Sequence, residues 1–187
     1  MVITLVGAGN LATCLGYALL TAGHTVRQVW SRTTASAETL GKLLQCPWTT
    51  DLQALSADTD LFVVSVKDSA LHEVAAQLPR HALVVHTAGS MPLDTLTQPR
   101  RGVFYPMQTF SKTHLVDFRQ IPIFVEAAAP DDEATLTDLA QSVSTQVRPL
   151  SSERRKFLHV AAVFACNMTN HCYQLAAEVL AEQDIPF

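Results

Sequence analysis

Residues 2–32 read VITLVGAGNLATCLGYALLTAGHTVRQVWSR. The apolar, β-branched run at 2–6 predicts one buried strand. It leads directly into the pattern G-x-G-x-x-A at 7–12. Apolar residues then recur with helical spacing as far as Gly23, which suits the position just after a helix. Residues 25–30 predict a second strand. The stretch therefore predicts strand, glycine turn, helix and strand, the context in which this pattern indicates a dinucleotide site.

The glycine pattern has a chemical reason at each position. Gly7 permits a sharp turn, Gly9 lets the backbone approach a pyrophosphate, and Ala12 lets the helix pack on the sheet. The helix N-terminus offers unpaired N–H groups and a partial positive charge. The alternative is a glycine turn in an α/β domain that binds nothing. We expect the pyrophosphate to be held by Gly7, Ala8, Gly9, Asn10, Leu11 and Ala12.

The end of the second predicted strand selects the cofactor. NAD sites usually carry Asp or Glu there, whereas this chain has Ser31, Arg32 and Thr33, and its next carboxylate is Glu38. A carboxylate would repel a 2′-phosphate, but a guanidinium can bind one with two hydrogen bonds and stack on adenine. The sequence therefore predicts NADP in preference to NAD. A solvated loop arginine is the alternative interpretation of Arg32.

Composition limits the class of protein. The chain has 187 residues, 48% of them hydrophobic, which suits one α/β domain with an additional element. The net charge of −4 and the absence of a long basic run argue against nucleic acid as a partner. The four cysteines lack metal or redox spacing, so we predict no metal site. A reducing compartment and no evident signal peptide favour the cytoplasm.

In the remainder of the first 149 residues, segments with the hydrophobic periodicity of a helix alternate with segments typical of a strand. Helices are predicted at 33–44, 70–78 and 131–144, and strands at 61–66, 82–86, 103–105, 121–126 and 145–148. Strands that alternate with helices predict a Rossmann fold of the α/β class, with a doubly wound parallel sheet. We place this dinucleotide-binding domain at 1–149 and the start of a C-terminal helical domain at 150–187.

Ligands of such sheets bind outside the carboxyl ends of the strands. This rule selects Val66 and Lys67 beside the ribose, although Lys67 could equally be a surface lysine. It selects His86 as a possible contact to cofactor or substrate, with a hydrogen-bonded structural histidine as the alternative. The rule also selects Thr87, Ala88 and Gly89 for the nicotinamide, and Gln108 and Thr109 for the substrate.

A long helix is predicted from residue 152 to about 183 and is apolar nearly all round, so it must be buried. Residues 157–177 contain no Asp, Glu, Lys or Arg and could span a bilayer by length. Their polar side chains would be costly in hydrocarbon, so we predict no membrane association. A second subunit or a larger second domain would cover the helix.

Polar residues interrupt the apolar surface of this helix. His159, Asn170 and, more loosely, Asn167 lie toward one side. We predict that they face the substrate, with His159 as proton donor because the reference pKa of histidine, near 6.5, suits acid–base work. Hydrogen bonds to a neighbouring helix are the alternative. No residue pattern in the sequence matches a serine or cysteine triad.

Several segments together carry a family resemblance: the glycine fingerprint, LFVVSVKD at 61–68, VVHTAGS at 84–90, FYPMQTFS at 104–111 and LHVAAVFACNMTNH at 158–171. The chain resembles Rossmann-like proteins with a C-terminal helical domain of unknown function. That group is similar to pyrroline-5-carboxylate reductases, prephenate dehydrogenases and 6-phosphogluconate-type dehydrogenases. The resemblance implies an NADP-binding domain and a helical domain that forms homodimers and closes the active site. It also implies reduction of a small carbonyl or imine, or the reverse oxidation.

Three departures accompany the resemblance. Tyr105 stands where related prephenate dehydrogenases have a histidine before Pro-Met, and the lysine-to-asparagine spacing of β-hydroxyacid dehydrogenases is missing from the long helix. Members of the group usually continue through several more helices, so we expect a truncated helical domain. The leading hypothesis is an NADP-dependent oxidoreductase acting on a small molecule. A non-catalytic NADP-binding sensor or interaction module is the alternative, and reduced deazaflavin is a third option as hydride partner.

Overall fold

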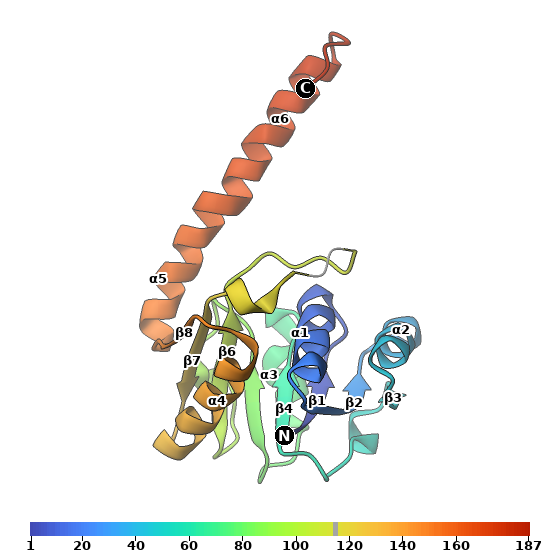
Figure 1. The fold of residues 1–187 in the computed structure, drawn as a ribbon, viewed down its shortest axis with the longest axis vertical. Helices are drawn as coiled ribbons and strands as arrows, with labels where there is room; N and C mark the ends of the chain where they lie inside the picture. Colours follow the sequence, from blue (N-terminus) through green and yellow to red (C-terminus); the bar gives the residue numbers. More distant parts are fainter. Residues whose placement is uncertain (114–115) are drawn as a thin grey trace.

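The computed structural model describes residues 1–113 and 116–187. An eight-stranded sheet with the order β3-β2-β1-β4-β5-β6-β7-β8 forms its centre (Figure 1). The order of the first six strands, 3-2-1-4-5-6, is that of dinucleotide-binding Rossmann domains, so the predicted fold is confirmed. The strands are β1 (Val2–Val6), β2 (Thr25–Trp30), β3 (Trp48–Thr49), β4 (Leu61–Val64), β5 (Leu83–His86), β6 (Arg101–Pro106), β7 (Ile123–Ala127) and β8 (Val147–Pro149).

Helices cover both faces of the sheet. On one face, α1 (Asn10–Thr21), α2 (Thr34–Leu44) and α4 (Pro130–Val143) share a core with β1 and β7. On the other face, α3 (Asp68–Ala76) packs against β4 and β5. All four residues of β4 are buried, as expected for a continuous apolar strand covered on both sides. Short 3₁₀ turns lie at η1 (Leu52–Ala54), η2 (Leu93–Thr95) and η3 (Phe118–Gln120).

The sheet is not wholly parallel, which corrects the sequence-based expectation. Strand β7 runs antiparallel to β6, and β8 runs parallel to β7. A parallel neighbour needs a crossover connection, usually a helix. The described residues between β6 and β7 contain only the 3₁₀ turn η3, so the chain returns in the opposite direction. The alternation of strand and helix patterns could not show this reversal. The two-residue edge strand β3 was also not predicted.

The C-terminal helix leaves the domain as a rod (Figure 1). It consists of α5 (Ser152–Ala162), a π-helical segment η4 (Val163–Met168) and α6 (Thr169–Ala181), which agrees closely with the predicted extent. The predicted burial is not found within the described chain. Only Arg155 is buried in α5, and no residue is buried in η4 or α6. The rod contacts the domain chiefly through α5, and the described residues leave the apolar side chains of η4 and α6 uncovered.

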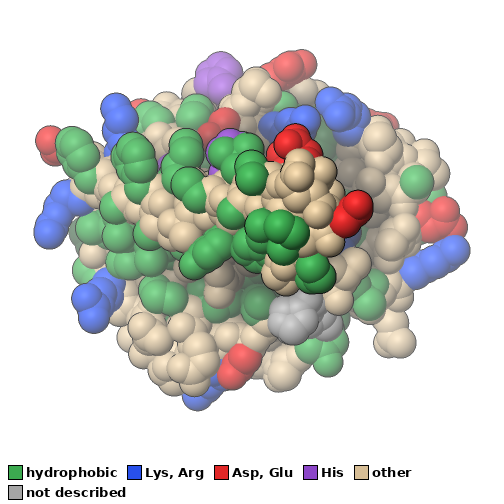
Figure 2. Space-filling view, turned by 90° about the horizontal axis from the view of Figure 1, so that it is seen from above, with side chains coloured by type: hydrophobic (Ala, Val, Ile, Leu, Met, Phe, Trp, Pro, Cys, Tyr) green, Lys and Arg blue, Asp and Glu red, His purple; other side chains and the backbone are tan. Residues whose placement is uncertain are grey.

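Large apolar side chains are exposed along this rod. Figure 2 looks down on the rod and shows hydrophobic side chains gathered along it. None of the helices in the described part of the chain combines the length and the apolar character needed to cross a membrane. The most exposed large apolar residues of the rod are Phe157, Phe164, Met168, Tyr173, Leu175 and Val179.

Candidate dinucleotide-binding site

The turn after β1 depends on glycine at position 7. Gly7 has φ of 128°, and its N–H donates to the carbonyl of Trp30 at 2.8 Å. A Cβ at this position would lie 2.4 Å from the backbone oxygen of Ser65. The ends of β1, β2 and β4 therefore meet too closely for any side chain. Gly7 is required by the backbone itself, in agreement with the sharp turn expected there.

Gly9 is different, because the space beside it is open. It precedes α1 with extended backbone angles, φ −81° and ψ −172°, and a Cβ at this position would meet no atom within 4 Å. Among residues 1–113 and 116–187, no side chain caps the N-terminus of α1. The first N–H groups of the helix are thus left for an anion, as in nucleotide-binding turns.

A hollow of about 570 Å³ lies at this edge of the sheet. Three cations reach it, Arg32 after β2, Lys67 after β4 and Lys112 from the connection after β6. Its described lining residues include no carboxylate. The open space at Gly9, the uncapped helix and the positive charge together fit a phosphate-rich dinucleotide. The lining residues are Gly7, Ala8, Gly9, Asn10, Trp30, Ser31, Arg32, Thr33, Ser36, Ser65, Val66, Lys67, Ser69, Ala70, Val74 and Lys112.

Most of the predicted cofactor residues are brought together in this hollow. Two members of the glycine pattern are not among the residues that line it: Ala12 is buried in the core below α1, and Leu11 packs against that core. The contribution expected of Ala12, close packing of the helix on the sheet, agrees with this position. Helical geometry explains the difference, because residues after Asn10 rotate away from the helix end and toward the sheet.

Lys112 was missed by sequence reasoning. The loop that carries it is tied to α1, since the side-chain nitrogen of Asn10 donates to the carbonyl of Phe110 at 2.9 Å and Cys14 Sγ to that of Ser111 at 3.4 Å. Asn10 therefore holds this loop as well as lining the hollow. No local pattern could have indicated Lys112, because 80 residues separate it from Arg32.

His86 is not among the residues that line the hollow, and it has the hydrogen bonds expected of the structural histidine that the sequence offered as the alternative. Its side chain is fully buried, Nε2 donates to the carbonyl of Pro92 at 3.2 Å, and Nδ1 accepts from the N–H of Ala88 at 3.2 Å; these protonation states are assigned from the partners. Burial, with a smaller contribution from the charge of Arg155, lowers the pKa of His86 to about 4. His86 is a neutral residue that shapes the turn after β5.

The buried state of His86 makes stability depend on pH. Between about pH 6.5 and 4 the unfolded chain binds more protons at this residue than the folded one, so the free energy of unfolding should fall as the pH falls. The full loss is about 3 kcal/mol. Denaturant unfolding at several pH values measures it. His86→Gln should reduce the slope, while His24→Gln, at a partly buried histidine whose pKa is also lowered, should change it less. Equal slopes in wild type and His86→Gln would contradict this account.

The other residues predicted near the strand ends do not all lie at the hollow. Thr87 Oγ1 donates to Ser65 Oγ at 3.2 Å and so adjoins the hollow, and Ala88 packs beside α3. Gln108 and Thr109 are exposed and do not line it. Gly89, the last predicted residue of the turn after β5, lies beside His159 of α5.

Of the three polar helix residues predicted to face the substrate, His159 contacts the sheet. Its Nδ1 is 3.1 Å from Tyr105 Oη at the end of β6, and both lie against Gly89. Asn167 and Asn170 are exposed farther along the rod, and the described part of the chain gives their side chains no hydrogen bond. The three residues thus do not form one cluster within this chain, because the rod carries the later two away from the domain.

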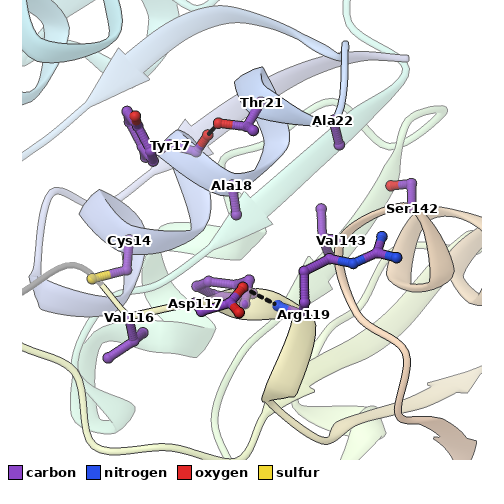
Figure 3. A pocket seen from close by; sticks show the side chains of 11 residues that line it. Cys14, Tyr17, Ala18, Thr21, Ala22, Val116, Asp117, Arg119, Ser142 and Val143 are labelled. Atoms are coloured by element: carbon purple, nitrogen blue, oxygen red, sulfur yellow. Dashed lines mark hydrogen bonds between the residues drawn. The ribbon is translucent and has the colours of Figure 1, made fainter.

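A second hollow of about 250 Å³ lies between α1, the 116–119 segment and α4 (Figure 3). Its described lining is mainly apolar, and its charged residues, Asp117 and Arg119, are linked by the Arg119 backbone N–H that donates to the Asp117 carboxylate at 3.0 Å. Its described lining residues include no glycine turn or helix N-terminus of the kind seen at Gly9. The larger hollow is therefore the candidate cofactor site.

Comparisons with known proteins identify the family of this chain. One family model, "NADP oxidoreductase coenzyme F420-dependent", matches residues 2–89, and a "Domain of unknown function (DUF2520)" matches residues 121–187. The solved structure of "putative NADP oxidoreductase BF3122" from Bacteroides fragilis is 46% identical, with a TM-score of 0.91, over 99% of this chain and 74% of that chain. The chain belongs to this NADP oxidoreductase family. It is accordingly an enzyme that uses a nicotinamide dinucleotide.

More distant solved structures share the fold of this oxidoreductase. An imine reductase from Myxococcus stipitatus in complex with NADP⁺ is 20% identical, with a TM-score of 0.74, over 100% of this chain and 68% of that chain. A pyrroline-5-carboxylate reductase from Coxiella burnetii is 20% identical, with a TM-score of 0.70, over 97% and 70%. At these identities the likeness shows the fold alone. A comparison with curated proteins gave no match.

Proposed function

We propose that this oxidoreductase prefers NADP(H) to NAD(H) and transfers a hydride between the nicotinamide and a small imine or carbonyl substrate. The observation that carries the preference is the hollow at the ends of β1, β2 and β4, with three cations and no carboxylate among its described lining residues. A carboxylate normally recognises the free 2′-hydroxyl of NAD, whereas cations bind a 2′-phosphate. We take the C=N substrate class from the names of the imine and pyrroline-5-carboxylate reductases that share the fold.

The proposed placement of the cofactor follows the strand ends. The turn at Gly9 and the N-terminus of α1 would hold the pyrophosphate, and Lys67 would flank the ribose. Ser31, Arg32 and Thr33 would hold the 2′-phosphate. The turn after β5 would border the nicotinamide. The bound cofactor supplies the hydride, and the protein's contribution is binding and orientation.

Arg32→Ala tests the 2′-phosphate assignment. We expect the Kd for NADPH to rise roughly 10- to 100-fold, because a charge-assisted pair with phosphate is lost, while the Kd for NADH changes less than about threefold. Calorimetric titration of both nucleotides measures the difference. Arg80→Ala, outside the described lining of the hollow, is the control and should change neither value. An equal loss for both nucleotides would end the assignment.

The reaction itself is tested in two steps. A thermal-shift titration with NADPH, NADH and no ligand should show greater stabilisation by NADPH, about 2.7 kcal/mol at one hundred times Kd. Consumption of NADPH is then followed with 1-pyrroline and with a series of small 2-oxo acids. Turnover of either class identifies the substrate class. NADPH binding without turnover of any probe would favour the binding-module hypothesis. The observation on its side is that Asn167 and Asn170 are exposed and line neither hollow of the described chain.

We also propose that a second copy of the chain covers the exposed rod. The proposed boundary between the two domains is at 149/150, and the proposed compartment is the cytoplasm. Apolar side chains exposed along one long helix are typical of an interface. Sedimentation at micromolar concentration should show a dimer for the wild-type chain. Phe164→Ser combined with Val179→Ser should give a monomer with unchanged NADPH affinity. A monomeric wild-type chain would contradict the proposal.

A further inference from the structure

Tyr105 and His159 form a pair that the dinucleotide site does not use. Tyr105 is 8% exposed near the end of β6, whereas His159 is partly exposed in α5. Tyr105 Oη and His159 Nδ1 are 3.1 Å apart, and the two rings meet edge to face with centroids 6.0 Å apart. A hydrogen bond therefore links a partly exposed histidine to a buried tyrosine.

The pair lies over the turn where the second half of a dinucleotide is expected. Strand β5 lies between β4 and β6, and Gly89 follows it. A Cβ on Gly89 would be 2.6 Å from His159 Nδ1 and 2.7 Å from Tyr105 Cζ. In a Rossmann sheet the dinucleotide crosses from the strands on one side of the switch point to those on the other. The pair thus sits directly on the turn that would border the nicotinamide.

A buried arginine fixes the histidine at this place. Arg155 lies one helical turn before His159 and is 1% exposed. It donates to Glu126 Oε2 at 2.6 Å, to the carbonyl of Met91 at 2.7 Å and to Ser152 Oγ at 3.0 Å. These bonds join the first turn of α5 to β7 and to the segment after β5. His159 therefore cannot shift along the sheet without breaking a buried network.

The surroundings of Tyr105 keep its proton in place. Burial raises the pKa of Tyr105, and the nearby positive charge of Arg155 opposes this without reversing it. The hydroxyl is therefore neutral near pH 7 and can accept a hydrogen bond through its oxygen. If Tyr105 accepts from Nδ1, the partly exposed ring is left with Nε2 as its free nitrogen.

We propose that Tyr105 is the positioning residue of His159: its oxygen accepts a hydrogen bond from Nδ1–H, so that protonated His159 presents Nε2–H to the substrate beside the nicotinamide. The inference rests on the proposed function. During reduction the substrate carbon gains the hydride from the reduced nicotinamide, and the electron pair of the C=N or C=O bond moves to the heteroatom. The heteroatom takes the proton of Nε2, and His159 regains a proton from water.

Nitrogen NMR of the 187-residue chain tests this arrangement without relying on turnover. Above the titration range of histidine, His159 of the wild-type chain should be the Nδ1–H tautomer. Tyr105→Phe, which removes only the acceptor oxygen, should return it to Nε2–H, the form that free histidine prefers. Tyr173→Phe, the same change at an exposed site of α6, should have no effect. Adding NADP⁺ should shift the Nε2 signal of His159 and leave that of exposed His171 in place.

Each other result has a defined meaning. An Nε2–H tautomer in the wild-type chain, or a tautomer unchanged by Tyr105→Phe, would overturn the positioning role. Calorimetrically confirmed NADP⁺ binding with an unmoved His159 signal would also overturn it, because the ring would then lie away from the cofactor. Failure of the wild-type chain to bind NADP⁺ would instead overturn the proposed function, and the inference would fall with it.

Discussion

Gly9→Val should leave the fold intact and strongly weaken the binding of NADPH. The backbone of Gly9 is extended, φ −81° and ψ −172°, which suits a β-branched residue, and the added Cβ would meet no protein atom within 4 Å. The isopropyl group would instead fill the space above the uncapped N-terminus of α1, where the pyrophosphate is proposed to bind. We expect the Kd to rise roughly 100-fold or more, the loss of about 2.7 kcal/mol of binding free energy.

Thermal unfolding and NADPH calorimetry of the same sample separate the two effects. Gly7→Ala is the matched control, because its Cβ would collide with the backbone of Ser65 at 2.4 Å and its φ of 128° disfavours any side chain. That variant should lose folding stability, whereas Gly9→Val should lose only the ligand. Wild-type NADPH affinity in Gly9→Val would refute the glycine turn as the pyrophosphate site.

Arg155→Met should cost about 3–5 kcal/mol of folding stability, because it removes the ion-pair partner of Glu126, a partly buried carboxylate. The methionine fills much of the same volume but replaces none of the hydrogen bonds to Glu126, Met91 and Ser152. Burial alone would raise the pKa of Glu126, yet the bonds from Ser152 and Arg155 outweigh it and lower that pKa. Without Arg155 only the hydrogen bonds from Ser152 remain to oppose the effect of burial.

Denaturant unfolding at neutral pH measures the effect of Arg155→Met. Arg154→Met is a close control, since Arg154 is the exposed neighbour of the same residue type and should change stability by less than about 0.5 kcal/mol. Adding Glu126→Gln to Arg155→Met should recover part of the loss by removing the unpaired charge. Equal stability of the Arg155→Met and Arg154→Met variants would show that the network does not hold α5 in place.

The first strand, the glycine turn, α1 and the second strand could be predicted because their determinants are local. Gly7 needs a backbone conformation that side chains disfavour, and helical and strand periodicities repeat within a few residues. Arg32 was found by the same means, since the residues after β2 follow directly from the position of that strand. The strand order then brought these predicted residues into one hollow.

The remaining features arise from contacts between residues far apart in sequence. Lys112 reaches the hollow through a loop tied to Asn10, and His86 is neutral because the turn after β5 closes around it. The direction of β7 follows from a connection without a crossover helix in its described residues. Apolar composition identified the C-terminal helix, but composition does not specify which surface covers it.

The sequence by itself therefore determined the Rossmann class, the nucleotide turn and the charge that favours a phosphate at the end of β2. Only the tertiary structure decided which polar residues meet. It excluded His86 from the hollow, separated Asn167 and Asn170 from the domain, and joined His159 to Tyr105 across 54 residues. The physical reason is that backbone conformation is set by neighbours along the chain, whereas hydrogen-bond partners and burial are set by packing between distant segments.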